Sequence, residues 1–437
     1  MTLVVGLGKT GLSCVRYFAG SEVPCAIADS RSAPPGLADV ERDYPHLQVR
    51  LGRFDADWFA TFERLIVSPG VAFSEPAVQA ARRAGSEVIG DIELFARNAR
   101  APVVAITGSN GKSTVTTLVE RLLAQLHCRV LSGANLGRPA LELLGQPRPD
   151  YYLLELSSFQ LETLASLRPA VAAIVNVSPD HMDRYASQRE YVQAKARIYR
   201  QARRCIYNAD DGQTAEFLPA RAKRNSFTLR VPRGRQFGIR CVEGCAWLAQ
   251  GKRTLLPVAD VGLRGRHNLA NVLAACAIVD ALGLDVAGAA PAIAAFTGLP
   301  HRMQSVCKRA GVQWINDSKG TNVGATVAAL RGLSAPIVLI AGGDGKGADF
   351  APLRDAVRAA RAVILIGRDA PALRSVLQGS TELLDASDMH DAVAKAAALA
   401  RSGDVVLLSP ACASFDMFDN YQQRGDEFVT AVRQLPA

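Results

Sequence analysis

The sequence predicts an α/β protein built from three domains. Short apolar runs rich in Val, Ile and Leu alternate with amphipathic helical stretches along most of the 437 residues, and this alternation is typical of α/β layers. At about 150 residues per domain, the length suggests three compact units. Breaks in the pattern place these units at residues 1–92, 93–298 and 299–437.

Composition indicates a chain that is folded throughout. Hydrophobic residues make up 49% and charged residues 21%, near the globular average, and no low-complexity tract is present. The net charge of +9 comes from 50 basic and 41 acidic residues. It is compatible with nucleic acid, an anionic membrane face or small anionic substrates. Because the basic residues read as scattered, without one stripe interleaved with aromatics, we expect no nucleic-acid partner.

The location of the protein follows from signals that the sequence lacks. The first six residues show no basic segment or cleavage site of a signal peptide, and no run reaches the roughly 18 apolar residues that span a bilayer. We therefore expect a cytoplasmic protein without membrane insertion. The nine cysteines are an odd number, and the close pair Cys241 and Cys245 lacks partners for a zinc site, so we expect reduced, mostly buried thiols.

The first unit is predicted to open on strands at 3–5, 25–28 and 65–67. The turn Gly6-x-Gly8-x-x-Gly11 follows the first strand, and Asp29 ends the second. In dinucleotide-binding proteins this pattern holds a pyrophosphate and a ribose hydroxyl, so an NAD-dependent oxidoreductase is one hypothesis. The same turn suits any nucleotide diphosphate, and Arg31 could serve a base or another phosphate.

The second unit begins with a strand at 102–106 and the sequence TGSNGKST at 107–114. Apolar residues then recur at helical spacing, so the loop opens onto a helix N-terminus. Glycines let backbone N–H groups converge on phosphate oxygens, Lys112 adds a positive charge, and a hydroxyl of Ser113 or Thr114 can reach Mg²⁺. The loop is shorter than the standard phosphate-binding loop, and an ordinary Gly-rich turn is the alternative; the lysine and hydroxyls favour phosphate binding.

Two further strands are predicted at 152–156 and 171–177, each followed by polar residues. Glu155 stands where nucleotide enzymes hold Mg²⁺, although a glutamate that caps the next helix would look similar. The second strand leads into Asp180, His181 and Asp183, at the sheet edge where ligands bind. Lys195 lies in the following helix, where the pattern alone favours a solvated lysine. A β-rich region at 203–263 and a helix at 268–282 complete the unit.

The third unit is predicted to contain strands at 312–315, 337–340, 363–366 and 405–408. Polar loops follow three of them, at 316–322, 342–347 and 409–416. Lys319 and Lys346, together with several hydroxyls, suit an anionic substrate that carries carboxylates.

Taken together and in this order, the motifs resemble those of the Mur ligase family over essentially the whole chain. They are GLGKTG, TGSNGKST, ELSSFQLE, NVSPDHMDRY, HNLAN, LPHR, WINDSKGTN, GGDGKGADF and SPACASFDMF. The resemblance implies an N-terminal Rossmann-like domain for a UDP-sugar, a central P-loop ATPase-like domain and a C-terminal Rossmann-like domain for an amino acid. The first, third and last motifs favour the family member that adds D-glutamate.

The resemblance also implies a reaction. ATP would phosphorylate the alanyl carboxylate of UDP-MurNAc-L-Ala, and the amino group of D-glutamate would attack the acyl phosphate through a tetrahedral intermediate. ATP, Mg²⁺ at two sites and an N-carbamylated Lys195 are implied, and we expect a monomer. A non-catalytic nucleotide switch is the remaining alternative, and it would need no such set of metal ligands.

Site residues follow from the resemblance, motif by motif. The catalytic set is Lys112, Glu155, His181, Lys195 and Arg302, of which Glu155, His181 and Lys195 would join Ser113 at the metal sites. ATP would be held by Gly108, Ser109, Asn110, Gly111, Lys112, Ser113, Thr114, Asn268, Asn271, Arg302 and Asp317. The UDP-sugar would be held by Thr10, Asp29, Ser30, Arg31, Gly70, Asn135, Gln160 and His181. Glutamate would be held by Thr321, Lys346, Ser414, Phe415 and Tyr421.

Three positions depart from the family pattern. Ser30 stands where threonine is familiar, Gly320 where alanine is usual and Tyr421 where phenylalanine is usual. These changes leave the reaction class intact, and Tyr421 bears on recognition of the amino acid.

Overall fold

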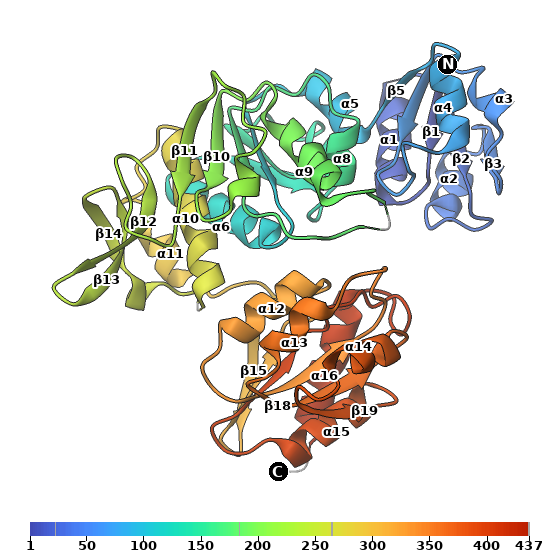
Figure 1. The fold of residues 1–437 in the computed structure, drawn as a ribbon. Helices are drawn as coiled ribbons and strands as arrows, with labels where there is room; N and C mark the ends of the chain where they lie inside the picture. Colours follow the sequence, from blue (N-terminus) through green and yellow to red (C-terminus); the bar gives the residue numbers. More distant parts are fainter. Residues whose placement is uncertain (22, 183, 264, 436–437) are drawn as a thin grey trace. The chain divides into compact units, whose positions relative to one another are not determined.

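The three-domain α/β fold is confirmed by a computed structural model, which contains three separate sheets (Figure 1). The structure describes residues 1–437 except 22, 183, 264, 436 and 437. These residues form two compact units. One contains residues 1–177, 189–260 and 270–293, and the other contains 178–188, 261–269 and the chain from 294 onward.

The first sheet is parallel and has the strand order β3-β2-β1-β4-β5. Its strands are β1 (Thr2–Val5), β2 (Cys25–Asp29), β3 (Val49–Leu51), β4 (Arg64–Val67) and β5 (Glu87–Ile89). The helices are α1 (Lys9–Gly20), α2 (Leu37–Asp43), α3 (Ala56–Phe59), α4 (Pro76–Arg83) and α5 (Asp91–Asn98). The three predicted strands are confirmed, whereas β3 and β5 were not predicted.

The second sheet has nine strands in the order β14-β13-β12-β11-β10-β9-β6-β8-β7. They are β6 (Val103–Thr107), β7 (Val130–Ala134), β8 (Tyr151–Glu155), β9 (Val171–Ile174), β10 (Arg204–Asn208), β11 (Lys223–Phe227), β12 (Phe237–Val242), β13 (Cys245–Gln250) and β14 (Arg253–Pro257). The sheet is parallel from β7 to β12, whereas β12, β13 and β14 pair antiparallel.

Helices connect these strands and continue the chain beyond them. They are α6 (Lys112–Gln125), α7 (Ala140–Leu143), α8 (Ser158–Glu162), α9 (Gln188–Ala196), α10 (Arg266–Ala281) and α11 (Ala290–Ala295), with the 3₁₀ helices η1 (Arg197–Tyr199), η2 (Gly212–Thr214) and η3 (Val258–Asp260). The predicted β-rich region and the helix that follows it are confirmed.

The third sheet has the order β15-β16-β20-β17-β18-β19, and only the β15–β16 pair is antiparallel. Its strands are β15 (Gln304–Arg309), β16 (Val312–Asn316), β17 (Ile337–Gly342), β18 (Ala360–Ile366), β19 (Glu382–Asp385) and β20 (Val405–Leu408). The helices are α12 (Val323–Arg331), α13 (Ala351–Ala356), α14 (Ala370–Leu377), α15 (Met389–Leu399) and α16 (Tyr421–Gln434).

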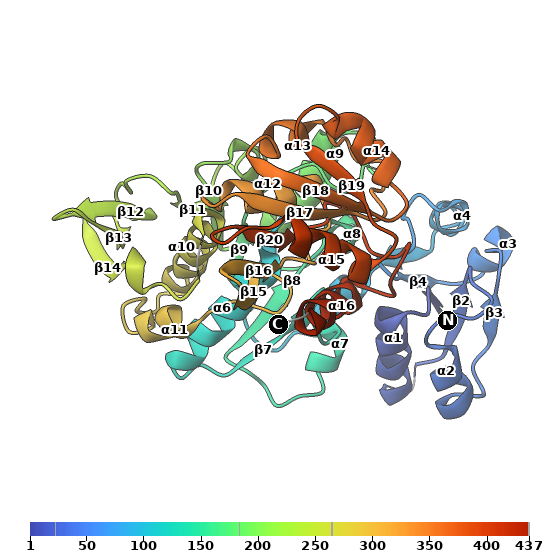
Figure 2. The same cartoon turned by 90° about the horizontal axis from the view of Figure 1, so that it is seen from below.

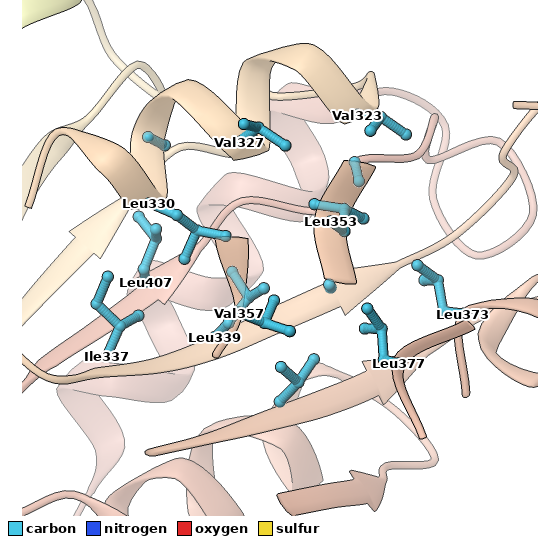
Figure 3. Close-up of a cluster of buried hydrophobic side chains, with 14 of the residues drawn as sticks. Val323, Val327, Leu330, Ile337, Leu339, Leu353, Val357, Leu373, Leu377 and Leu407 are labelled. Carbon is cyan, nitrogen blue, oxygen red and sulfur yellow. The ribbon is translucent and has the colours of Figure 1, made fainter. Parts of the chain in front are cut away.

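Apolar side chains cover both faces of this third sheet. Along β17, Leu339 packs in a core with α12, α13 and α14, as Figure 3 shows, whereas Val338 and Ile340 pack in a second core with α15 and α16. Successive residues of a strand point to opposite faces, so a continuous apolar run fits a sheet buried on both sides. Figure 2 shows the same strands, labelled β15 to β20, from below.

Strand order gathers the predicted motifs at the carboxyl ends of the strands in the second and third sheets. β6 lies between β8 and β9, so the loop that follows β6 is next to Glu155 and next to the segment after β9. In the third sheet β20 lies between β16 and β17, which gathers the three predicted polar loops. Ligands of open parallel sheets bind beyond such carboxyl ends.

Candidate active site

The loop after β6 has the backbone shape that a phosphate needs. Gly111 is the residue before α6 and has a φ of +76°, which glycine adopts without strain. A Cβ atom at this position would lie 2.4 Å from Oδ1 of Asn271. Gly111 is therefore required both by its conformation and by the close approach of Asn271. The first turn of α6 forms the positive end of the helix dipole.

Two lysine side chains meet at one backbone oxygen of this loop. Nζ of Lys112 donates to the carbonyl oxygens of Gly108 at 2.8 Å and Ser109 at 3.0 Å. Nζ of Lys195, from α9, also donates to the Gly108 oxygen at 2.8 Å. Lys195 is only 1% exposed, and its Nζ lies 4.4 Å from the centre of the Tyr191 ring. The interpretation of Lys195 as a solvated lysine is therefore wrong.

Asn176, from the segment after β9, holds the loop in place. Its Oδ1 accepts from the backbone N–H of Asn110 at 2.8 Å, and its Nδ2 donates to the Asn110 oxygen, also at 2.8 Å. The hydroxyls of Ser109 and Tyr191 are 3.1 Å apart, while Ser113 and Thr114 are buried in the first turn of α6. The sequence motif contained Asn176, but its role as a clamp depends on the pairing of β6 with β9.

Glu155 ends β8 with one carboxylate oxygen engaged and one orphaned. Oε1 accepts from Nδ2 of Asn135 at 2.5 Å. Oε2 is buried and has no hydrogen-bond partner among the described residues. The following helix, α8, is capped by Ser157 and Gln160 in a capping box, so the alternative that Glu155 caps it is wrong. A buried carboxylate oxygen without a donor is an expected position for a cation.

The turn after β1 is fixed by Asp29. Its Oδ2 accepts from the Leu7 N–H at 2.6 Å, and both carboxylate oxygens accept from the Arg31 guanidinium. Burial alone would raise the pKa of Asp29, but the hydrogen bonds from Arg31 and Leu7 outweigh it and lower the pKa. Asp29 thus acts on the turn and on Arg31. A Cβ atom at Gly11 would lie 1.8 Å from the Gly6 oxygen, so α1 packs closely on the turn.

Thr10, Ser30, Gly70 and Gln160, which are also predicted to hold the UDP-sugar, lie in the same compact unit as this turn. Ser30 and Gly70 are exposed, and Thr10 is partly buried in the first turn of α1. Gln160 is buried, and its Nε2 lies 3.4 Å from Oδ2 of Asp91 at the start of α5. Asp91 is also buried, its Oδ1 has no partner among the described residues, and burial raises its pKa to about 6. Sequence reasoning had not singled out Asp91.

His181 belongs to the second compact unit, in the segment 178–188. It has a φ of +57°, and its backbone N–H donates to Oδ1 of Asp180 at 3.0 Å. Oδ2 of Asp180 accepts from Nδ2 of Asn322 at 3.1 Å, which ties this segment to the start of α12. The predicted acid Asp183 lies outside the described residues.

Asp317 follows β16 and is deeply buried. Ser409 Oγ donates to its Oδ2 at 2.8 Å, and the Met303 N–H donates to its Oδ1 at 3.1 Å. Burial raises the pKa of Asp317 to about 7, against the hydrogen bond from Ser409 and the charge of Arg302. The predicted ATP residues Arg302 and Asn268 lie in the same unit, where Arg302 is partly buried and Asn268 is buried.

Arg424 of α16 joins two of the three polar loops of the third domain. It is 1% exposed and donates to the backbone oxygens of Ser318 at 2.8 Å, Cys412 at 3.1 Å and Ala413 at 3.2 Å. Burial lowers its pKa to about 10. No motif marked this residue, because its role arises from a helix that folds back beneath both loops.

The third loop is joined to the others by the backbone. Asp344 exchanges two backbone hydrogen bonds with Ala413, and its Oδ1 accepts from the Lys346 N–H at 3.0 Å. Lys346 has a φ of +52°, which the tight turn imposes. The loops at 317–321, 342–347 and 409–414 therefore form one continuous rim at the carboxyl edge of the sheet.

Of the predicted glutamate residues, Thr321, Lys346 and Ser414 lie in this rim, Phe415 follows it, and Tyr421 is the first residue of α16. Ser414 is buried, Thr321 is partly buried and Phe415 is 71% exposed. The Tyr421 ring receives Nζ of Lys319 at 4.0 Å from its centre, a distance typical of a cation–π contact. Lys319 was noted in the sequence but was not assigned to the predicted glutamate set.

The described residues contain neither a candidate membrane span nor a cluster of metal-ligating side chains. No helix among them is long and apolar enough to cross a membrane. No group of three His, Cys, Asp or Glu side chains among them could hold a metal ion unaided. The nine cysteines are free, and five of them are buried, as the sequence predicted.

Comparison with known proteins gives matches along nearly the whole chain. Family models described as the MurD-like N-terminal domain, the middle domain and the glutamate ligase domain of Mur ligases match residues 1–90, 106–279 and 301–412. The UDP-N-acetylmuramoylalanine–D-glutamate ligase of Nitrosococcus oceani is 52% identical over 99% of this chain and 96% of its own length. The ligase of the same name from Pseudomonas aeruginosa is 48% identical over 99% of this chain and 98% of its own.

Solved structures share the fold at low sequence identity. The MurF ligase of Thermotoga maritima in complex with ADP has a TM-score of 0.62 at 16% identity, covering 99% of this chain and 94% of that one. The UDP-N-acetylmuramate–alanine ligase of Thermotoga maritima has a TM-score of 0.61 at 18% identity, covering 99% of each chain.

Proposed function

Because the chain belongs to the Mur ligase family, we propose that it is an ATP-dependent ligase that adds D-glutamate to UDP-N-acetylmuramoyl-L-alanine in peptidoglycan precursor synthesis. The observation that carries this choice within the family is the 52% identity over nearly the full length to a relative named for that reaction. An NAD-dependent oxidoreductase would use only the turn after β1. It would not account for the phosphate loop after β6 or for the polar loops of the third sheet.

The chemistry requires activation of an inert carboxylate. The L-alanyl carboxylate takes the terminal phosphoryl group of ATP, and ADP leaves. The amino group of D-glutamate then attacks the acyl phosphate, and phosphate leaves from the tetrahedral intermediate. In this proposal Lys112 and the N–H groups of the loop bind the phosphates and stabilise their developing charge. Arg302 binds the terminal phosphate, Asp317 the ribose, and Asn268 and Asn271 the adenine side.

The residues present fit a magnesium site. Mg²⁺ is usually bound through one or two carboxylates, with substrate phosphates and water completing its shell. The orphaned Oε2 of Glu155 supplies such a carboxylate, and the hydroxyl of Ser113 lies in the first turn of α6. When bound there, Mg²⁺ would neutralise phosphate charge. We propose that Ser113, Glu155, His181 and the carbamylated Lys195 serve the two magnesium ions.

Carbamylation of Lys195 is part of the proposal. A buried lysine is destabilised by its own charge, and CO₂ adds to the neutral amine to give a carbamate, with loss of one proton. Lys195 is 1% exposed beside the phosphate loop, which supports this assignment. Labelled bicarbonate should give a carbamate signal in the NMR spectrum of the protein, and Lys195→Arg should lack that signal.

The two organic substrates are assigned to different domains. We propose that Thr10, Ser30, Arg31, Gly70, Asn135, Gln160 and His181 hold the UDP-sugar, with Asp29 acting through Arg31. Thr321, Lys346, Ser414, Phe415 and Tyr421 would hold glutamate, with Lys319 added from its contact with Tyr421. The domain limits at 92/93 and 298/299 follow the same division.

Release of phosphate tests the proposed function directly. We expect phosphate only when ATP, Mg²⁺, UDP-N-acetylmuramoyl-L-alanine and D-glutamate are all present. Each omission is the control for one component. Equal rates with L-glutamate or meso-diaminopimelate in place of D-glutamate would contradict the assignment.

The assembly and location of the protein complete the proposal. We propose that the protein is a monomer and that it works in the cytoplasm, where its nucleotide substrates are. Sedimentation at working concentration should give the mass of one chain, and a concentration-independent dimer would contradict this.

A further inference from the structure

The positive charge of the chain is concentrated in one segment. Residues 221–253 hold nine Arg and Lys residues and a single acid, Glu243, so this segment carries +8 of the net +9. The other 404 residues are close to neutral. The expectation of scattered basic residues is therefore wrong: the excess belongs to β11, β12, β13 and the turns between them.

The fold brings the turns of this segment together. The Gly251 N–H donates to the Gln236 oxygen at 3.0 Å, and a Cβ atom at Gly251 would lie 2.1 Å from the Gly234 oxygen. The turn at 233–236 thus packs on the turn at 250–253. Nε of Arg240 donates to the Gly251 oxygen at 3.1 Å, which brings a third segment to the same place. We call this the basic face: Arg230, Arg233, Arg235, Arg240, Lys252 and Arg253.

Acidic neighbours offset only part of the charge. Arg230 is paired with Asp210 at 3.2 Å, Arg235 with Asp280 at 3.2 Å and Arg253 with Asp285 at 3.8 Å. In the described part of the chain, no ion pair engages Arg233, Arg240 or Lys252. All members of the basic face except Arg240 are exposed. The face therefore keeps a net positive charge next to solvent.

An exposed aliphatic side chain lies among these cations. Val231 is 57% exposed and stands between Arg230 and Arg233. Exposed large hydrophobic side chains are few in this chain, so its place within the basic face is notable. Cations together with an exposed apolar side chain match an anionic lipid surface, which offers phosphates above an apolar layer.

Nucleic acid fits the basic face less well. Proteins that bind single strands stack bases on exposed aromatic rings. In the segment 221–253, Phe227 and Phe237 are buried and Trp247 is partly buried opposite Arg240 in the β12–β13 pair. Figure 1 shows β12, β13 and β14 at the outer end of the nine-stranded sheet. In the strand order, β11, β10 and β9 separate them from β6, which the phosphate loop follows.

We propose that the basic face binds the enzyme peripherally to anionic phospholipid membranes, through lipid phosphates and with Val231 at the headgroup level. This binding requires neither catalysis nor a membrane-spanning helix. It is therefore independent of the proposed ligase reaction. Each cation near an anionic surface strengthens binding, so removing several has a large effect that salt reduces.

Sedimentation with vesicles tests the proposal on the full chain. Wild-type protein should bind vesicles of equimolar phosphatidylglycerol and phosphatidylcholine and should not bind pure phosphatidylcholine. The double variant Arg233→Glu/Lys252→Glu should partition at least tenfold less. The control Arg83→Glu/Arg331→Glu changes net charge equally at exposed sites elsewhere and should bind like wild type. Phosphate release should be unchanged in all three proteins.

Two further measurements separate lipid from other anions. Val231→Ser should lower vesicle binding by roughly threefold and should not alter the salt dependence, because it removes apolar contact alone. A duplex DNA at matched phosphate concentration should bind less tightly than the vesicles. Failure to bind anionic vesicles at low salt, equal losses in the control variant, or tighter binding of DNA would each overturn the proposal.

Discussion

A buried lysine beside a phosphate loop is the most informative single residue of the site. Lys195 donates to the same Gly108 oxygen as Lys112, so the lysine proposed to carry the carbamate lies beside the lysine proposed to bind phosphate. We expect Lys195→Ala to lower kcat by roughly a hundredfold or more, because groups that stabilise transferring phosphoryl charge contribute on that scale. ATP binding, measured by calorimetry, should change little because Lys112 remains. Lys308→Ala, at an exposed position, is the control, and a fully active Lys195→Ala would contradict the metal-site assignment.

Asp91 gives the fold a pH dependence. Its pKa is raised to about 6 by burial, above the value of about 4 in the unfolded chain. The folded state therefore favours the protonated form, so the contribution of Asp91 to stability is fully present below about pH 4 and is lost as the pH rises through 6. By linkage the loss approaches about 3 kcal/mol.

Replacement of Asp91 removes this dependence. In Asp91→Asn, the free energy of unfolding should vary less between pH 4 and pH 6 than in the wild type, by up to about 3 kcal/mol. Urea unfolding across this range measures the difference. Asp57→Asn, at an exposed position, should keep the wild-type slope. A slope in Asp91→Asn that equals that of the wild type would show that another group titrates.

Residues with local motifs were predictable, and residues with only long-range contacts were not. Gly111 and Lys112 are recognisable because the loop, the strand before it and the helix after it are contiguous in sequence. Arg424 is not, since it contacts Ser318, which lies 106 residues away in the sequence. Lys195 was misjudged for the same reason: its burial depends on the approach of α9 to the loop after β6.

At the scale of elements, the strands that were not predicted share a position. Each lies at the edge of a sheet: β3 and β5 in the first, β7 in the second, β15 and β19 in the third. Edge strands have one open side and are only partly buried, so they lack the continuous apolar runs of central strands. Central strands outside the β-rich region 203–263 were predicted within a few residues, whereas in that region only the strand content was predicted.

The packing of α1 on its turn gives a sharp test. Gly11→Ala places a Cβ atom against the Gly6 oxygen, so α1 must shift away from β1. We expect weaker binding of UDP-N-acetylmuramoyl-L-alanine and a loss of about 2 kcal/mol or more in unfolding free energy. Gly8→Ala is the matched control, because a Cβ atom there meets nothing within 4 Å. An equal effect in both variants would contradict the packing argument.

Arg424 offers the same kind of test for the third domain. Lysine keeps the charge but cannot form the fork that reaches Ser318, Cys412 and Ala413 together. We expect Arg424→Lys to lower the unfolding free energy by about 3 kcal/mol and to raise the KM for D-glutamate more than it lowers kcat. Arg433→Lys, exposed in the last turn of α16, is the control. An unchanged KM alongside lower stability would limit Arg424 to a structural role.

At the scale of the whole molecule, the excess of positive charge and the phosphate loop lie in different parts of the chain. The phosphate loop lies after β6, while most of the net positive charge lies in residues 221–253, at the outer strands of the same sheet. The length of the chain predicted the number of domains. The net charge, in contrast, does not say where on the molecule the basic residues gather. Only the fold shows that Arg233, Arg240 and Lys252 converge through the contact of two turns.

The two compact units predict how the chain unfolds. The first contains α1 and Asp91, and the second contains Arg424 and the rim of polar loops. Because each unit has its own core, we expect two transitions in differential scanning calorimetry. Gly11→Ala should lower the midpoint of one transition, and Arg424→Lys that of the other. Saturating D-glutamate analogue should raise only the transition that Arg424→Lys lowers, because a ligand stabilises the unit that binds it. A single transition that both variants lower equally would contradict independent unfolding of the units.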